Sequence, residues 1–236
     1  MNVPVVAVIV GAGLGTRFSS GVAKAALDLG GKPLVIRALE ALTDGGATQA
    51  VVVLRDEVAA ELADWWQTSS IPVQIVSGGP TRQDSVRCGV AAALQIPEVV
   101  NSFDETVVLI HDAARPLVPA KVVADVIAAV RSGASAVAPG IELADSVRQR
   151  SGNSWCSVNR ESLRLVQTPQ GFPATVIKQV SEFLAGKSAF TDDISGAEAA
   201  GFSVTLIPGD AAALKITRET DLLVARALLP ESEKSN

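Results

Sequence analysis

The sequence contains few of the side chains on which metal and redox sites usually depend. Its 236 residues include one histidine, His111, and two cysteines, Cys88 and Cys156. A single histidine excludes any mechanism that needs two, and it excludes most zinc sites. The two cysteines show no metal-binding spacing and are too few for a disulfide framework. We therefore expect both cysteines to be packing residues in a reducing environment.

The sequence also lacks an excess of positive charge and a long hydrophobic stretch. Its formal net charge is −5, which argues against nucleic acid or an anionic membrane as a general partner. The apolar run that ends at Val10 is too short for a signal sequence or a membrane span. We therefore expect a cytoplasmic protein that meets any anionic ligand with local cations.

The most informative stretch is the first expected strand and the loop after it. Val5 to Val10 are all apolar and mostly β-branched, which is typical of an interior strand of a parallel sheet. Three glycines follow on alternate positions of the segment 11–15, where missing Cβ atoms would let backbone N–H groups surround an anion. Arg17 and Lys24 lie just beyond, and their charges could stabilise an anionic transition state.

This loop does not match two common phosphate-binding signatures. The dinucleotide fingerprint needs a glycine where this chain has Thr16, so an NAD-dependent oxidoreductase is disfavoured. The Walker A loop needs a Gly-Lys-Ser/Thr ending, which is absent here. A glycine-rich turn that binds no ligand remains the structural alternative for this segment.

Strands and helices alternate along the chain, which predicts a doubly wound and mostly parallel α/β sheet of the Rossmann-like kind. Strands are expected at residues 5–10, 49–54, 73–76, 105–110, 134–139, 164–166 and 204–207. Helices are expected at 34–42, 56–66, 81–95, 119–131, 173–184, 191–200 and 220–229. We expect a single domain over residues 1–230, followed by a flexible tail at 231–236.

The alternation breaks between residues 141 and 160. Strand-like pieces flank the polar turn Ser151-Gly152-Asn153 with no helix between them. This pattern predicts a β-hairpin arm that protrudes from the main sheet. Because a two-stranded arm is only marginally stable alone, we expect it to pack on a second subunit. The alternative is an antiparallel extension of the main sheet.

Polar clusters follow most of the expected strands at their carboxyl ends. Ligands of open α/β sheets bind at this edge, so we expect these clusters to meet there. They contain several cations and one acid, Asp112, that is suited to Mg²⁺. This combination is typical of a site for two phosphorylated ligands. A phosphate monoester with a second pKa near ~6 is already a nucleophile at neutral pH, so no protein base is required, and His111 is expected only to hydrogen-bond its loop.

Seven short motifs, in order along the chain, resemble those of one enzyme family. They are Gly13-Leu14-Gly15-Thr16-Arg17-Phe18 with Lys24, Arg82-Gln83-Asp84-Ser85-Val86, His111-Asp112-Ala113-Ala114-Arg115, Asp145-Ser146, Thr168-Pro169-Gln170, Thr191-Asp192-Asp193 and Lys215-Ile216-Thr217. From Val5 to Leu229 the chain resembles the 2-C-methyl-D-erythritol 4-phosphate cytidylyltransferases of the non-mevalonate isoprenoid pathway. The resemblance implies a nucleotidyltransferase that joins CTP and methylerythritol phosphate, with Mg²⁺ as cofactor, and releases pyrophosphate.

The resemblance also implies roles for individual residues. The implied catalytic residues are Arg17 and Lys24, at the α-phosphate of CTP, and Arg160 and Lys215, at the phosphate of methylerythritol phosphate. The implied nucleotide-binding residues are Ala12, Gly13, Gly15, Gly79, Ser85, Asp112 and Ala113, of which Asp112 would also hold the metal. The implied substrate-binding residues are Arg115, Ser146, Thr168 and Thr191. The family forms homodimers with embracing arms, so Ser146 and Arg160 would enter the neighbouring site.

Two other functions remain open on the sequence. Ribitol 5-phosphate cytidylyltransferase shares the fold and the chemistry and differs in the alditol phosphate. A nucleotide sensor on the same fold would bind CTP without releasing pyrophosphate. Arg17, Lys24 and Lys215 argue against the sensor, because a sensor has no need to stabilise a pentavalent phosphorus.

Overall fold

The computed structural model describes residues 3–13, 23–186 and 190–233. The strands of the main sheet are β1 (Val5–Val10), β4 (Gln49–Leu54), β5 (Val73–Ser77), β6 (Val107–Asp112), β7 (Ala136–Ile141), β10 (Leu165–Val166), β11 (Gln170–Pro173) and β12 (Val204–Pro208). Two further strand pairs are β2 (Asp28–Leu29) with β3 (Lys32–Pro33), and β8 (Val147–Ser151) with β9 (Ser154–Val158). The helices are α1 (Leu34–Asp44), α2 (Asp56–Glu61), α3 (Ala63–Gln67), α4 (Arg82–Ala93), α5 (Pro97–Asn101), α6 (Ala120–Arg131), α7 (Ala174–Leu184), α8 (Asp193–Ala199) and α9 (Glu219–Leu228).

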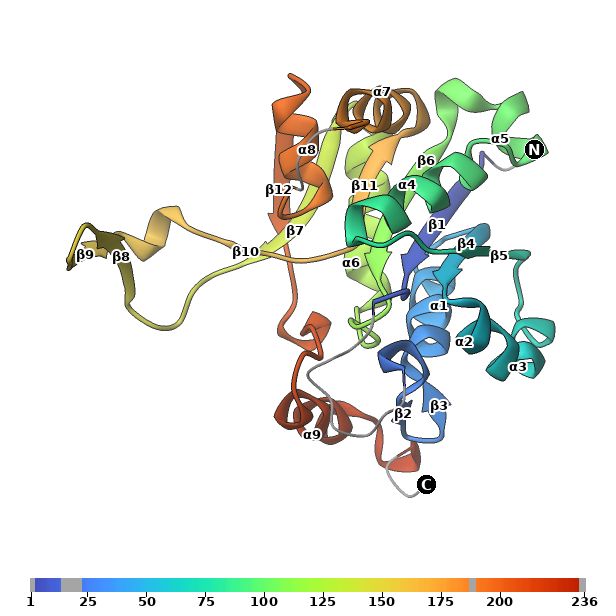
Figure 1. The fold of residues 1–236 in the computed structure, drawn as a ribbon, viewed down its shortest axis with the longest axis horizontal. Helices are drawn as coiled ribbons and strands as arrows, with labels where there is room; N and C mark the ends of the chain where they lie inside the picture. Colours follow the sequence, from blue (N-terminus) through green and yellow to red (C-terminus); the bar gives the residue numbers. More distant parts are fainter. Residues whose placement is uncertain (1–2, 14–22, 187–189, 234–236) are drawn as a thin grey trace.

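The main sheet has eight strands in the order β10-β7-β11-β6-β1-β4-β5, with β12 also paired to β7 (Figure 1). The pairs β6–β1, β1–β4, β4–β5 and β7–β12 are parallel. The expected doubly wound, mostly parallel sheet is therefore confirmed. The adjacent carboxyl ends of β1, β4, β5 and β6 form one edge, where the polar clusters were expected to meet.

Two layers of helices cover the sheet because the strands are apolar on both faces. In β1, Ala7 and Ile9 pack with residues of α1 and α6 on one face. Val6 and Val8 pack with residues of α4 and α7 on the other face. All four side chains are fully buried. Alternate residues of a strand point to opposite faces, so a strand covered on both sides needs the unbroken apolar run that the sequence contains.

Strand β11 was not expected from the sequence. It lies between β6 and β7 and is antiparallel to both. Its four residues include a glycine and a proline, which disfavour strands, so the signal is weak. Gly171 lets the strand approach α6, since a Cβ atom there would lie 2.4 Å from a side-chain carbon of Val126. Tertiary packing therefore forms this strand where local preference does not.

The segment 141–160 forms the expected arm. Strands β8 and β9 pair antiparallel with each other, from Val147 opposite Val158 to Ser151 opposite Ser154. They form their own two-stranded sheet, which projects away from the domain (Figure 1). The hairpin prediction is confirmed, and the alternative of an antiparallel extension of the main sheet is wrong. Trp155 on this arm is 65 % exposed.

Two smaller expectations need correction. Strand β6 was expected to end at Ile110, but it continues through His111 and Asp112. Both residues are therefore placed by sheet hydrogen bonds rather than by a loop. Cys88 and Cys156 were expected to be packing residues, but both are exposed free cysteines. No helix among the described residues is long and apolar enough to cross a membrane.

The chain after α9 makes a specific contact with the domain. Residues Glu231–Glu233 form a short 3-10 turn, and the Glu233 carboxylate accepts a hydrogen bond from the Arg37 guanidinium. Arg37 lies on α1, is only 7 % exposed, and also donates to the carbonyls of Leu29 and Gly30. The tail expected at 231–236 therefore begins with a turn that gives a buried cation its carboxylate partner.

Removing residues 231–236 is expected to lower the free energy of unfolding by ~1–3 kcal/mol, because a buried charged donor would lose its partner. The matched control removes only 234–236 and keeps Glu233. Thermal unfolding of the two shortened chains measures the difference. Equal midpoints would show that Glu233 contributes nothing, as a wholly flexible tail requires.

Candidate active site

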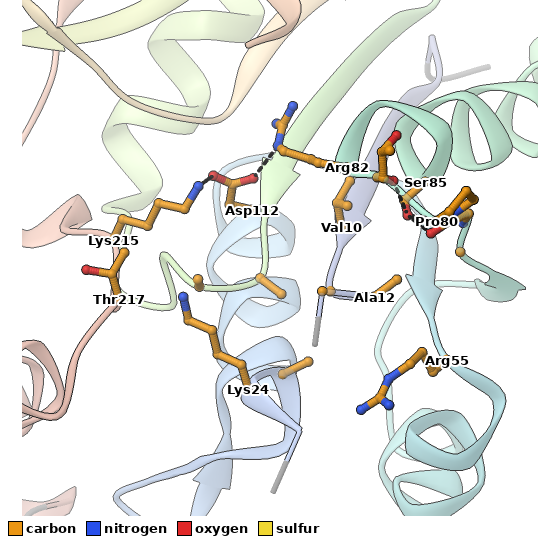
Figure 2. A pocket seen from close by; sticks show the side chains of 18 residues that line it. Val10, Ala12, Lys24, Arg55, Pro80, Arg82, Ser85, Asp112, Lys215 and Thr217 are labelled. Carbon is orange, nitrogen blue, oxygen red and sulfur yellow. Dashed lines mark hydrogen bonds and ion pairs between the residues drawn. The ribbon is translucent and has the colours of Figure 1, made fainter. Parts of the chain in front are cut away.

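A cavity of about 630 Å³ opens at the carboxyl ends of β1, β4, β5 and β6 (Figure 2). Its wall combines segments that are far apart in the sequence. The predicted site residues that line it are Ala12, Gly13, Lys24, Gly79, Ser85, Asp112, Ala113 and Lys215. The expectation that Lys24 and Lys215 meet at one edge of the sheet is therefore confirmed.

One side of the cavity is a tight turn between β5 and α4. Gly78 and Gly79 leave no room for a side chain, because a Cβ atom would lie 2.3 Å from the Cβ atoms of Ala12 and Asp84 respectively. The Ser85 hydroxyl donates to the carbonyl of Thr81 at 3.0 Å and accepts from the N–H of Gly79 at 3.2 Å. These bonds give the turn a defined backbone shape, which suits recognition of a ligand by main-chain groups.

The opposite side of the cavity is built around Asp112, the last residue of β6. Its Oδ1 accepts from Nε of Arg82 at 3.0 Å, and its Oδ2 accepts from Nζ of Lys215 at 2.7 Å (Figure 2). Burial by itself would raise the pKa of the Asp112 carboxyl. The charges of Arg82 and Lys215 outweigh burial and hold that pKa well below its usual range. Asp112 is therefore ionised throughout the neutral range.

Arg82 contacts a second carboxylate on its other side. Its Nη1 and Nη2 donate to the two oxygens of Asp193 at 3.2 and 2.8 Å. Asp193 is the first residue of α8 and is buried. Burial opposes the charge of Arg82, but Asp193 and Asp112 together raise the pKa of its guanidinium above the usual value. One guanidinium thus joins α4, β6 and α8.

His111 has a structural role, as expected. Its Nε2 lies 3.1 Å from the carbonyl oxygen of Arg115, and its Nδ1 lies 3.0 Å from the hydroxyl of Thr168. Because a carbonyl only accepts, Nε2 donates and Nδ1 accepts the Thr168 proton. The same hydroxyl oxygen accepts from the N–H of Asp112 at 3.2 Å. Burial lowers the pKa of His111 to about 4, so the ring is neutral and fully occupied by these bonds.

The remaining predicted residues that the structure describes do not line the cavity. Arg115 donates to the carbonyls of Ala213 and Val166, and Thr168 is buried behind Asp112. Thr191 is exposed just before α8. Ser146 and Arg160 are exposed on the arm, where Arg160 donates to the carbonyl of Ala144. Gly15 and Arg17 lie outside the described residues.

Arg55, Arg82 and Thr217 line the cavity, although the sequence argument gave them no role. Arg82 belongs to one of the seven motifs and follows the end of an expected strand, which places it at the ligand-binding edge of the sheet. This position in the sequence could have identified Arg82 as a site residue. Its partner Asp193 is 111 positions away, and nothing local in the sequence pairs the two.

The described residues offer one carboxylate to a metal ion, not a closed metal cage. Among them no group of three or more His, Cys, Asp or Glu side chains could hold an ion. Mg²⁺ at phosphate-transfer sites is commonly held by one or two carboxylates together with the phosphates of the substrate. Asp112 is ionised and lines the cavity, so it fits this open kind of site, and it would share its charge between the metal ion, Arg82 and Lys215.

Comparisons with known proteins show which family nearly the whole chain resembles. The enzyme of Saccharopolyspora erythraea named 2-C-methyl-D-erythritol 4-phosphate cytidylyltransferase is 42 % identical over 95 % of this chain and 99 % of its own length. The crystal structure of the cytidylyltransferase of that name from Thermus thermophilus is 32 % identical, covers 97 % of this chain and 98 % of its own, and has a TM-score of 0.73. A structure of 4-diphosphocytidyl-2C-methyl-D-erythritol synthase from Anaerococcus prevotii has a TM-score of 0.82, with 25 % identity over 95 % of both chains. Residues 5–231 match the family profile, and the chain belongs to the 2-C-methyl-D-erythritol 4-phosphate cytidylyltransferase family.

Proposed function

We propose that this chain transfers a cytidylyl group from CTP to 2-C-methyl-D-erythritol 4-phosphate. The products are 4-diphosphocytidyl-2-C-methyl-D-erythritol and pyrophosphate, an early step toward isoprenoid precursors. The observation that carries the proposal is the meeting of Lys24, Lys215 and Asp112 in one cavity with a glycine-lined turn, in a chain of this family. Several cations around one cavity suit two anionic substrates that must be brought together.

The reaction is a substitution at the α-phosphorus of CTP. An oxygen of the methylerythritol phosphate forms the new P–O bond, and the bond from the α-phosphorus to the bridging oxygen breaks as pyrophosphate leaves. Lys24, together with Arg17, would stabilise the negative charge on the α-phosphate oxygens. Lys215 would hold the attacking phosphate in line. Most of the catalytic effect then comes from positioning and charge stabilisation.

The nucleotide would bind along the glycine-lined side of the cavity. Ala12, Gly13 and Gly15 would bind the triphosphate, and the turn at Gly79 and Ser85 would face cytosine. The Ser85 hydroxyl already bonds within that turn, so the backbone of the turn, rather than this hydroxyl alone, would recognise the base. Ala113, directly after Asp112, would line the same path.

Asp112 would hold a divalent cation such as Mg²⁺, which supplies charge neutralisation for the triphosphate and for departing pyrophosphate when it is bound. The carboxylate is suited to this role because Arg82 and Lys215 keep it ionised at neutral pH. No protein base is assigned. His111 is buried and neutral, with both ring nitrogens in hydrogen bonds, and the attacking phosphate is itself ionised near neutral pH.

We also propose a homodimer that forms through the arm at 141–160, with residues 1–230 as one nucleotidyltransferase domain. Arg160 and Ser146 are exposed on this arm and do not line the cavity of their own chain. Trp155 on this arm is 65 % exposed, and a two-stranded arm of this kind is only marginally stable unless it packs on another surface. Arg160 would then complete the side of the neighbouring cavity that binds methylerythritol phosphate, while Thr168 and Arg115 support the wall behind Asp112. Thr191, exposed just before α8, would lie near the bound substrate.

Pyrophosphate release from CTP with a panel of alditol phosphates tests the activity. We expect turnover with methylerythritol phosphate and much weaker turnover with ribitol 5-phosphate. A preference for ribitol 5-phosphate would overturn the substrate assignment. Binding of CTP without pyrophosphate release from any alditol phosphate would instead support a nucleotide sensor.

Mixed dimers test whether two chains share a site. Lys24→Ala should lower kcat by about 100-fold or more, because it removes a group that stabilises the transition state. Arg160→Ala should mainly raise KM for methylerythritol phosphate. At a methylerythritol phosphate concentration where each variant alone is slow, mixing the two should restore part of the activity, because one of the two sites would regain both residues. An absence of rescue in verified mixed dimers would contradict the shared site.

The dependence of activity on pH tests whether the phosphate of methylerythritol phosphate attacks without the help of a protein base. Activity should fall about tenfold per pH unit below ~6, as the attacking phosphate takes up its second proton. His111 also matters here: its pKa is about 4 in the folded chain against 6.5 as a reference. The unfolded state therefore binds more protons as pH falls from 6.5 toward 4, and stability falls with it. Circular dichroism at each pH separates the two effects, and a flat activity profile across this range would contradict the mechanism.

A further inference from the structure

Four side chains of alternating charge form a connected series at the side of the cavity assigned to methylerythritol phosphate, which we call the acceptor side. Three of them line the cavity, and the fourth, Asp193, does not. From α8 to the segment after β12 they are Asp193, Arg82, Asp112 and Lys215. The shortest N–O distances between neighbours are 2.8, 3.0 and 2.7 Å. Arg82 contacts two carboxyl groups, Asp112 and Asp193. Burial raises the pKa of Asp193, and the charge of Arg82 opposes that rise. Arg82 therefore spends its donors within the protein and adds little net attraction for phosphate. Its presence at the cavity wall therefore needs a reason other than charge.

Asp193, at one end of this series of charges, is buried and is held in place by hydrogen bonds. Asp193 is 8 % exposed, and the backbone N–H groups of Asp193 and Ile194 donate to the side-chain oxygen of Gln170 at 2.9 and 3.0 Å. Gln170 belongs to β11 and is itself buried. The backbone of Asp193 is thus attached to the central sheet, and its two carboxylate oxygens fix the direction of the Arg82 guanidinium.

The shape of a guanidinium suits the position of Arg82. Two of its nitrogens contact Asp193, and the third nitrogen, Nε, contacts Asp112. A planar, forked donor can satisfy two carboxylates in fixed directions at once, whereas an ammonium acts as a point charge on a flexible stem. Lys215 has such a flexible stem, and its ammonium contacts the other oxygen of Asp112.

We infer that Arg82 is a positioning residue for the transfer reaction. Asp193 clamps it, it orients the carboxylate of Asp112, and Asp112 in turn places the ammonium of Lys215 at the cavity. The inference rests on the proposed function, because that function assigns Lys215 to the acceptor phosphate. Arg82 also opens α4, directly after the turn that contains Gly79. It therefore ties the nucleotide side of the cavity to the acceptor side.

Two substitutions of Arg82 separate geometry from charge. Arg82→Gln and Arg82→Lys should each lower kcat by between about 10- and 100-fold, since small displacements of a positioned group have effects of this size. KM for methylerythritol phosphate should rise more than KM for CTP. The matched control is Arg87→Gln on the same helix, where Arg87 is exposed and pairs with Asp84; its kcat should stay within about twofold. Near-normal kcat in Arg82→Lys would show that only charge matters and would contradict the inference.

A double variant tests whether Asp193 and Arg82 act as one unit. Asp193→Asn keeps the side-chain shape but weakens the clamp, and it should lower kcat in the same way as Arg82→Gln. The double variant Arg82→Gln, Asp193→Asn should lose little more than either single variant, because coupled groups are not additive. Fully additive losses would contradict the clamp. Thermal unfolding of every variant ensures that kcat is compared between folded chains.

A readout without turnover keeps this inference separate from the proposed function. In a crystal structure of Asp193→Asn, the Asp112 carboxylate and the Lys215 ammonium should leave the positions they have in the unsubstituted chain. Unchanged positions would overturn the role of Arg82 even if the enzyme is active. Failure of the unsubstituted chain to release pyrophosphate would instead overturn the proposed function, and the crystallographic comparison would still decide the clamp.

Discussion

The candidate site depends on one buried carboxylate that contacts two cations. Asp112 ends the central strand β6, where desolvation would otherwise favour its neutral form. Arg82 and Lys215 reverse that preference, and each comes from a different part of the chain. If either cation were absent, the pKa of Asp112 would rise. The position of the remaining cation would also be less well defined. The sheet helps to bring the three segments together, because β1 pairs with β6 as far as Asp112 and so places its backbone.

Neighbouring residues of the same strand divide the structural and functional roles. Successive side chains of a strand point to opposite faces. Asp112 lines the cavity, whereas His111 bonds to Thr168 and to the carbonyl of Arg115. Thr168 then bonds back to the N–H of Asp112. Thr168 and Arg115 are therefore part of the support beneath the carboxylate within this chain, and their side chains hold together the wall on which a substrate would rest.

The glycine-lined turn and the cationic wall, which is the side of the cavity with Arg82 and Lys215, have different roles. Gly78 and Gly79 permit an approach between backbone segments that any side chain would block, which leaves main-chain groups to face a ligand. The cationic wall reduces the repulsion between the two proposed substrates, because both carry phosphate. Because Arg82 and Lys215 are largely neutralised by Asp112 and Asp193, the wall offers ordered donors rather than a strong general field. This agrees with the modest negative net charge of the whole chain.

The sequence by itself determined the alternation of strands and helices, the apolar interior strands, the protruding arm and the edge of the sheet at which the polar motifs meet. These features follow from local periodicity and from the rule that parallel strands end at a common edge. Only the tertiary structure decided that β11 is a strand, that β6 reaches Asp112, and that Asp193 clamps Arg82. Those features arise from contacts between residues far apart along the chain. The sequence of a short segment does not indicate which distant residues it will contact. A strand such as Gln170–Pro173 exists because its neighbours supply hydrogen bonds on both sides, and a salt bridge across 111 positions exists because the fold places its two ends together.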